Sequence, residues 1–320
     1  MSLVMLATTH RVAPGALTWP AWQTLRSASR VLVGSDDHPQ LPYLREAGVR
    51  VEVAEPDPRA LIEAARSGTV VWVAAPDGDE RLLREIGTLV VSGGAEVVDM
   101  EVLHASYDLP GARLLDLVTV MDTLRRECPW DREQTHESLV PYLLEESYEV
   151  LDTVESGDLH ALREELGDVL MQVAFHSVVA SERSDDTGFT IDDVAAGIVD
   201  KLVRRHPHVF GDVTVADADE VNANWEQIKA AERAEKSEDH SILDGVPMGQ
   251  PALSLSAQLQ RRADRAGAPE DLYAGLGEGI GAELFALVAR ARGEGRDAEA
   301  ELRDIARRFR DRVQEWEQDR

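Results

Sequence analysis

The chain has 320 residues, of which 60 are acidic and 33 basic, so its formal net charge is −27. A hydrophobic fraction of 43% argues against a disordered chain, and the length predicts two or three domains at roughly 150 residues each. The negative charge argues against binding to nucleic acid or to an anionic membrane, since both need a positive surface. A small phosphate ligand stays compatible with it, because a metal ion and a few local cations can meet its charge.

Two further features of the composition suggest a cytoplasmic protein. The single cysteine, Cys128, excludes a disulfide framework and a cysteine-based zinc cluster. No apolar run approaches the roughly 18–20 residues of a membrane helix, and the first residues lack the basic region of a signal peptide. We therefore expect no targeting segment and no membrane association.

Residues 1–112 are predicted to form a small α/β domain. Short apolar, β-branched runs recur there and alternate with helical stretches, which favours βα units on a mostly parallel sheet. The predicted strands are 3–7, 31–34, 51–53, 69–74, 88–91 and 96–98, and the predicted helices include 58–67 and 79–85. Gly93-Gly94 indicates a turn, and no phosphate-binding glycine motif occurs in this region.

From about Ala112 the apolar residues recur at helical spacing, and residues 113–242 are predicted to be a helical domain. A first helix is interrupted by the sequence C-P-W-D at 128–131, and a second begins near Thr135. After a turn at 156–158, a third helix runs to about 179, a fourth from Thr190 to about 205, and a fifth over 221–236. The segment 237–251 is predicted to be a linker, and residues 252–320 are again helical.

Acidic side chains concentrate on the second and third of these helices. On the second helix, Glu145 and Glu146 precede Glu149 by four and three residues. On the third helix, Glu165 precedes Asp168 by three. Residues at these spacings share one helix face. Because a short turn makes the two helices antiparallel neighbours, we expect the two acidic groups to face each other.

A solvated acidic face is the simplest alternative, and two observations weigh against it. Like charges at this spacing destabilise a helix by about a few tenths of a kcal/mol per pair, yet residues 141–200 contain fifteen acids and only two bases. The acids also adjoin the apolar stripe. A hard divalent cation would relieve the repulsion, and Mg²⁺ takes oxygen ligands and commonly bridges to phosphates. The lack of His and Cys in the group disfavours zinc.

The acidic pattern E-E-x-x-E at 145–149 followed by E-x-x-D at 165–168 resembles the signature of MazG-type nucleoside triphosphate pyrophosphohydrolases. Three further motifs match in order: C-P-W-D with Q-T-H at 128–136, R-R-H-P-H-V-F-G at 204–211, and N-W-E-x-x-K at 224–229. The resemblance covers about residues 113–242. It implies a mainly α fold: an all-α NTP pyrophosphatase helical bundle, preceded here by a small α/β domain.

The resemblance also implies roles for individual residues. It implies that Glu146, Glu149, Glu165 and Asp168 coordinate Mg²⁺, for which Mn²⁺ can substitute. Glu145 is a further ligand, a partner of a ligand, or the base that orients water.

Four more residues resemble the substrate-binding set of the family. Lys201 and Arg205 match residues that approach the triphosphate, Trp225 matches a base-stacking residue, and Lys229 follows it by one helical turn. Ordinary structural roles stay open for them: Trp225 as a core aromatic, and Arg205 with Arg204 as a solvated helix end.

These residues together predict a Mg²⁺-dependent hydrolase that converts an NTP or dNTP and water to the monophosphate and pyrophosphate, in house-cleaning of the nucleotide pool. The family implies a homodimer. The alternative is a regulatory module that binds nucleotides without turnover. Within the enzyme class, specificity for deoxyuridine or deoxycytidine triphosphate is a further alternative.

The two flanking regions carry weaker resemblances. Residues 243–320 resemble a degenerate second copy of the same domain, since 164–170 can be aligned with 278–284, an offset of 278 − 164 = 114 residues. Gly279 and Ala282 replace two of the acids in that copy, and chance similarity of two amphipathic helices is the alternative. Residues 1–112 resemble a truncated tetrapyrrole-methylase-like domain, from which we expect no methyltransferase activity.

Overall fold

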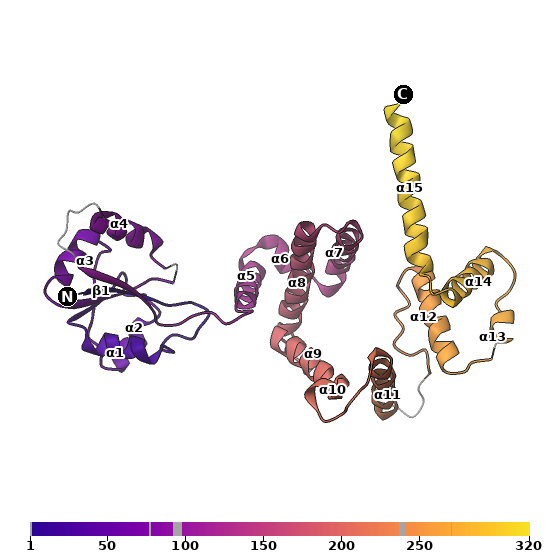
Figure 1. Ribbon diagram of the computed structural model, residues 1–320, viewed down its shortest axis with the longest axis horizontal. Coiled ribbons are helices and arrows are strands. Elements are labelled where there is room, and N and C mark those ends of the chain that lie inside the picture. Colours follow the sequence, from indigo (N-terminus) through magenta and orange to yellow (C-terminus); the bar gives the residue numbers. More distant parts are fainter. Residues whose placement is uncertain (1, 77, 92–97, 237–240, 270) are drawn as a thin grey trace. The chain divides into compact units, whose positions relative to one another are not determined.

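The computed structural model describes residues 2–76, 78–91, 98–236, 241–269 and 271–320 (Figure 1). The contacts divide the chain into two compact units, Met1–Ile198 and Val199–Arg320. The first unit holds an α/β part and a group of helices, and the described part of the second unit is helical. The predicted mainly α fold with an α/β region before it is thus observed.

The α/β part is built on a parallel sheet of five strands, with the spatial order β3-β2-β4-β1-β5. In chain order the strands are Ser2–Ala7 (β1), Arg30–Val33 (β2), Val51–Val53 (β3), Thr69–Val73 (β4) and Asp99–His104 (β5). Four helices connect them: Trp19–Ser27 (α1), Leu41–Glu46 (α2), Pro58–Ala65 (α3) and Glu80–Val91 (α4).

The sheet is covered on both faces, so its central strands are apolar at almost every position. Successive residues point to opposite faces. In β1, Leu3 and Met5 face the core beneath α3 and α4, whereas Val4 and Leu6 face the core formed with α1 and α2 (Figure 1). This is why the runs at 3–7, 31–34 and 69–74 are correctly predicted as strands; the run at 51–53 is also a strand, but it lies at the edge of the sheet and is partly exposed.

Two predicted strands of this region need comment. The strand predicted at 88–91 is wrong, because these residues form the last turn of α4. Leu82 and Ile86 are buried in the sheet core, and Leu89 packs against the same core, so the helical period continues to the end of α4. The strand predicted at 96–98 and the turn at 93–94 fall largely or wholly outside the described residues, and the strand that follows them is β5, which the sequence analysis does not predict.

Helices follow the sheet from residue 113 onward. They are Arg113–Glu127 (α5), Pro129–Glu133 (α6), His136–Ser156 (α7) and Leu159–Ser181 (α8). A small core of Met121, Leu139, Ala174 and Phe175 holds α5, α7 and α8 together. The predicted interruption at 128–131 is the junction between α5 and the short α6.

Local capping groups define the hairpin of α7 and α8. Thr135 and Ser138 exchange side-chain and backbone hydrogen bonds at the start of α7. Gly157 ends the helix in the left-handed conformation, with φ of 75°. Asp158 then accepts hydrogen bonds from the first amides of α8, at 2.9 and 3.1 Å. The predicted turn at 156–158 is therefore confirmed, and the two helices lie side by side (Figure 1).

The remaining helices begin with α9, which crosses the boundary between the units. They are Ile191–Arg205 (α9), Pro207–Phe210 (α10), Ala218–Lys236 (α11), Ala252–Arg265 (α12), Asp271–Ala274 (α13), Ile280–Gly293 (α14) and Ala298–Gln318 (α15). Buried Gln260 joins α12 to α14 by a 2.8 Å hydrogen bond to the carbonyl of Phe285. No helix among the described residues is long and apolar enough to span a bilayer.

The aligned segments of the predicted repeat differ in local structure. Glu164 and Glu165 lie inside α8, whereas Glu278 and Gly279 precede the first residue of α14. Gly279 has a φ of 144°, which an L residue rarely adopts. Glu164 and Glu165 therefore have no helical counterpart there, whereas the position of Asp168 corresponds to Ala282 inside α14. The domain boundaries at 112 and 242 stay predictions.

Candidate functional site

The hairpin of α7 and α8 brings the predicted acidic groups together. One carboxylate oxygen from each of Glu146, Glu165 and Asp168 lies within 4.8 Å of the other two. Glu149 joins this group, because its carboxyl is close enough to raise the pKa values of both Glu146 and Glu165. The four residues that the family resemblance assigns to the metal are thus neighbours. We call Glu146, Glu149, Glu165 and Asp168 the carboxylate cluster.

Glu145 lies at the margin of the carboxylate cluster. Its side chain is exposed, and its charge acts on the neighbouring Glu146. It contributes to the negative field of the site without belonging to the close group of three oxygens.

The electrostatics of the carboxylate cluster are those of like charges held close together. Partial burial raises the pKa of Glu146, and so do the charges of Asp168, Glu149 and Glu145. The pKa of Glu165 is raised in the same way, by burial and by the charges of Glu149, Asp168 and Glu164. The charges that raise these two pKa values most all belong to acids. Among the described residues, no ion pair with a basic side chain offsets their repulsion.

This donor set fits a hard divalent cation. It offers only oxygen atoms, from both helices, at separations that allow one ion to contact several of them. A bound cation would reverse the local electrostatics, since it favours the ionised carboxylates that now repel each other. The cluster is therefore a candidate metal centre.

The four predicted substrate-binding residues belong to the second unit. Lys201 and Arg205 are one turn apart on α9, and Trp225 and Lys229 are one turn apart on α11. The Lys201 side chain is exposed, and the Lys229 ammonium lies 6.0 Å from the centre of the Trp225 ring. His206 packs edge-on against Trp225, with ring centres 4.7 Å apart.

Arg205 is not a free cation, because Glu232 of α11 holds it. The Arg205 Nη2 donates to Glu232 Oε2 at 2.5 Å and its Nε to the same oxygen at 3.2 Å. Arg204 donates from Nε to Glu232 Oε1 at 2.7 Å. These bonds lower the pKa of Glu232 to about 2, so the carboxylate is ionised at neutral pH.

The sequence analysis does not identify two pairs of polar residues. One is the ion pair between Glu232 and Arg205, and the other is the pair His136–His176 between α7 and α8. Their Nδ1 atoms are 2.8 Å apart, and the two rings are nearly parallel, at 5°. Each contact joins residues 27 to 40 positions apart. A helical period groups only residues of one helix and gives no signal for such pairs.

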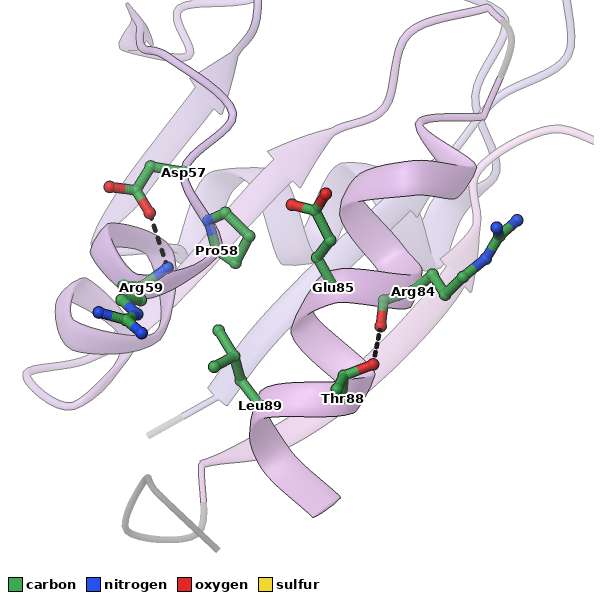
Figure 2. Close-up of a pocket in the computed structure, with 7 residues that line it drawn as sticks. All are labelled: Asp57, Pro58, Arg59, Arg84, Glu85, Thr88 and Leu89. Atoms are coloured by element: carbon green, nitrogen blue, oxygen red, sulfur yellow. Dashed lines mark hydrogen bonds between the residues drawn. The ribbon is translucent and has the colours of Figure 1, made fainter. Parts of the chain in front are cut away.

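The α/β part also carries a shallow hollow. Asp57, Pro58 and Arg59 border it from the start of α3, and Glu85, Thr88 and Leu89 with Arg84 border it from α4 (Figure 2). Its polar groups serve their own helices: the Asp57 carboxylate caps Arg59 N at 2.9 Å, and Thr88 Oγ1 donates to Arg84 O at 2.9 Å. We assign it no ligand.

Comparisons with known proteins identify the family of the chain. The family model of the MazG nucleotide pyrophosphohydrolase domain matches residues 134–210. A nucleoside triphosphate pyrophosphohydrolase of Escherichia coli K12 is 41% identical over 63% of this chain and 86% of its own length. The chain belongs to the MazG family. The match of the family model includes the whole carboxylate cluster, Lys201 and Arg205, whereas Trp225 and Lys229 lie beyond it.

Other relatives extend the similarity. An uncharacterised 26.1 kDa protein of Streptomyces cacaoi is 47% identical over 75% of this chain and 98% of its own. A nucleoside triphosphate pyrophosphohydrolase of Mycolicibacterium smegmatis is 45% identical over 65% of this chain, which spans 60% of that relative. A crystal structure of a MazG-related protein from Thermotoga maritima covers 36% of this chain at 28% identity, with a TM-score of 0.32.

Proposed function

We propose that the chain is a Mg²⁺-dependent nucleoside triphosphate pyrophosphohydrolase, which converts an NTP or dNTP and water to the monophosphate and pyrophosphate. The carboxylate cluster carries the proposal: one oxygen from each of Glu146, Glu165 and Asp168 lies within 4.8 Å of the other two, and burial together with neighbouring acids raises the pKa values of Glu146 and Glu165. Such an arrangement favours a bound divalent ion, and the membership of the chain in the MazG family supplies the reaction class.

In this proposal Glu146, Glu149, Glu165 and Asp168 hold the ion, with Mn²⁺ as a substitute. A bound Mg²⁺ would neutralise the triphosphate, polarise the phosphoryl oxygen and lower the pKa of a bound water.

The chain's own groups supply the remaining functions. A carboxylate of the acidic set, Glu145 included, orients the water and accepts its proton as the water oxygen bonds to the α-phosphorus. The bond from that phosphorus to the bridging oxygen breaks, and pyrophosphate leaves. Lys201 and Arg205 meet the charge that develops on the leaving group, and Trp225 stacks on the base, with Lys229 beside it.

The proposal is tested by measuring pyrophosphate release from the purified chain. A panel of the eight common NTPs and dNTPs, with oxidised nucleotides added, is assayed with and without Mg²⁺. We expect release that depends on Mg²⁺ and a preference within the panel that identifies the house-cleaning substrate. Nucleotide binding without any pyrophosphate release would instead support the regulatory alternative.

A further inference from the structure

The contacts of Glu232 can fix the orientation of the Arg205 side chain, in addition to joining α11 to α9. Glu232 Oε2 accepts hydrogen bonds from Nε and Nη2 of Arg205, at 3.2 and 2.5 Å, so the carboxylate lies beside the Nε edge of the guanidinium, in a side-on arrangement. Among the described residues, no hydrogen bond is made to the Nη1 end of the guanidinium, which is left to other ligands. Both side chains are largely covered, with 15% of Arg205 and 18% of Glu232 exposed. A guanidinium held in this way has one fixed orientation and one open edge.

Position along α11 connects Glu232 with the other predicted substrate-binding residues. Trp225, Lys229 and Glu232 are separated by four and three residues, so they lie on one face of the helix. That face meets the end of α9, because Glu232 binds Arg205 and Trp225 packs against His206. The residue that holds the arginine therefore belongs to the surface that carries the proposed base-stacking and phosphate-binding groups.

Charge leaves this surface able to bind an anion. Two guanidinium groups share one carboxylate, so the group of Arg204, Arg205 and Glu232 keeps one net positive charge. The carboxylate stays ionised across the neutral range because its two arginines lower its pKa. Glu232 thus orients Arg205 without cancelling the attraction to phosphate.

We propose that Glu232 is a positioning residue for substrate binding: it holds Arg205 side-on, so that the free edge of the guanidinium is ready for the polyphosphate. This inference rests on the proposed function, in which Arg205 binds the polyphosphate. Arg204 also binds Glu232, but the Arg204 side chain is 55% exposed and is not held in a comparable way. An arginine fixed in advance loses less side-chain freedom when its ligand binds.

The first measurement is the binding of inorganic tripolyphosphate to the full chain by titration calorimetry, which needs no turnover. We expect Glu232→Gln to weaken binding about threefold to tenfold, the range that corresponds to freeing one long side chain. Glu232→Asp keeps the charge and should restore part of the affinity. Glu220→Gln is the matched control, because it makes the same change on an acid of α11 whose hydrogen bond goes to the Ala216 amide, and we expect a change below about twofold.

A double-mutant cycle separates positioning from a merely structural role. If Glu232 acts through Arg205, adding Glu232→Gln to Arg205→Ala should weaken binding no further. An equal loss in both backgrounds, or unchanged or tighter binding in the single Glu232→Gln variant, would overturn the inference. Circular dichroism of each variant establishes that α9 and α11 are intact.

Pyrophosphate release from an NTP distinguishes this inference from the proposed function. In an active enzyme, Glu232→Gln should raise KM and also lower kcat, because Arg205 both binds the polyphosphate and meets the charge that develops on the leaving group. If the wild-type chain binds tripolyphosphate but releases no pyrophosphate, the proposed function fails and the cycle still decides the role of Glu232. If wild-type protein does not bind tripolyphosphate, the positioning role is wrong whatever the turnover.

Discussion

At the scale of single residues, Asp168 is the sharpest test of the carboxylate cluster. Asp168→Asn removes one ligand charge and keeps the size of the side chain, so we expect more than a tenfold loss of pyrophosphate release, or over about 1.4 kcal/mol of transition-state stabilisation. Since the charge of Asp168 raises the pKa values of Glu146 and Glu165, its removal relieves repulsion. Thermal stability should stay level or rise slightly.

Glu164→Gln is the matched control for that experiment. Glu164 is an acid of the same helix, lies outside the close group of oxygens, and is 3.6 Å from His160. We expect it to keep most of the activity. A folded Asp168→Asn protein with more than about a tenth of wild-type activity would mean that Asp168 is not an essential ligand or that a second site exists.

Trp225 is the residue whose role is most open to a kinetic test. It contacts His206 edge-on and has Lys229 beside its ring. Because base stacking contributes mainly uniform binding, Trp225→Ala should raise KM more than it lowers kcat. Trp225→Phe keeps an aromatic face and should recover part of the loss. Unchanged nucleotide binding by folded Trp225→Ala would reduce Trp225 to a packing residue.

At the scale of elements, the helical hairpin is the part that the sequence predicts best. Its signals are local: the apolar period, Thr135 before α7, and glycine followed by aspartate at the turn. The acids follow from the same period, because residues three or four apart share a face. The prediction of their proximity therefore needed only one further step, the antiparallel packing of two helices joined by a short turn.

The errors arise where the tertiary structure decides the outcome. Thr88 to Val91 is β-branched at both ends, yet the buried positions Leu82 and Ile86 extend a helix through it. β5 is the reverse case, since it lies at the edge of the sheet and pairs with β1 only. Its charged and polar positions hide the apolar pattern of a strand. Local composition therefore misassigns the first segment and misses the second.

The contact between α7 and α8 at His136 and His176 predicts a dependence of stability on pH. Burial and the nearby His136 lower the pKa of His176 below its ordinary value of 6.5. The unfolded chain therefore binds more protons than the folded one below about this value, and stability is lost as pH falls towards the folded pKa. Two protonated rings with Nδ1 atoms 2.8 Å apart would also repel each other.

His136→Gln removes one of the two charges, so the melting temperature of this variant should fall less between pH 7.5 and 5.5 than that of the wild type. The raised pKa values of Glu146 and Glu165 act in the opposite direction, because these groups gain protons on folding as pH falls. Both proteins retain them, so the difference between the two curves isolates the histidine pair. Parallel curves would contradict the prediction.

At the scale of the whole molecule, exposed apolar stripes support the homodimer that the family resemblance implies. On α7, Val140, Leu144 and Tyr148 recur every four residues and are 47%, 52% and 49% exposed. On α9, Ile198 and Leu202 are likewise four residues apart, and their exposed fractions are 46% and 43%. Exposed large apolar side chains that share one helix face are typical of a surface that another surface covers.

We expect light scattering after gel filtration to give twice the mass of the 35.2 kDa chain. Val140→Asp places a charge on the α7 stripe away from the acids and should shift the mass towards that of one chain. Thr153→Asp, on α7 outside the stripe, is the control and should not. A wild-type protein with the mass of one chain would contradict the prediction.

Removal of the metal tests how the charge of the molecule is balanced. With a net charge of −27 and a carboxylate cluster that no described cation neutralises, excess EDTA should abolish pyrophosphate release, and Mg²⁺ or Mn²⁺ should restore it. The helices should survive chelation, because Met121, Leu139, Ala174 and Phe175 form their core without the ion.

The melting temperature gives a second test of the metal site. An ion that binds only the folded state adds stability by mass action, so millimolar Mg²⁺ should raise the melting temperature of the wild type. Asp168→Asn should show a smaller rise, since it lacks one ligand charge, and exposed acids elsewhere set the background common to both proteins. Undiminished hydrolysis in EDTA, or equal Mg²⁺-dependent shifts in the two proteins, would show that the cluster is not the metal site.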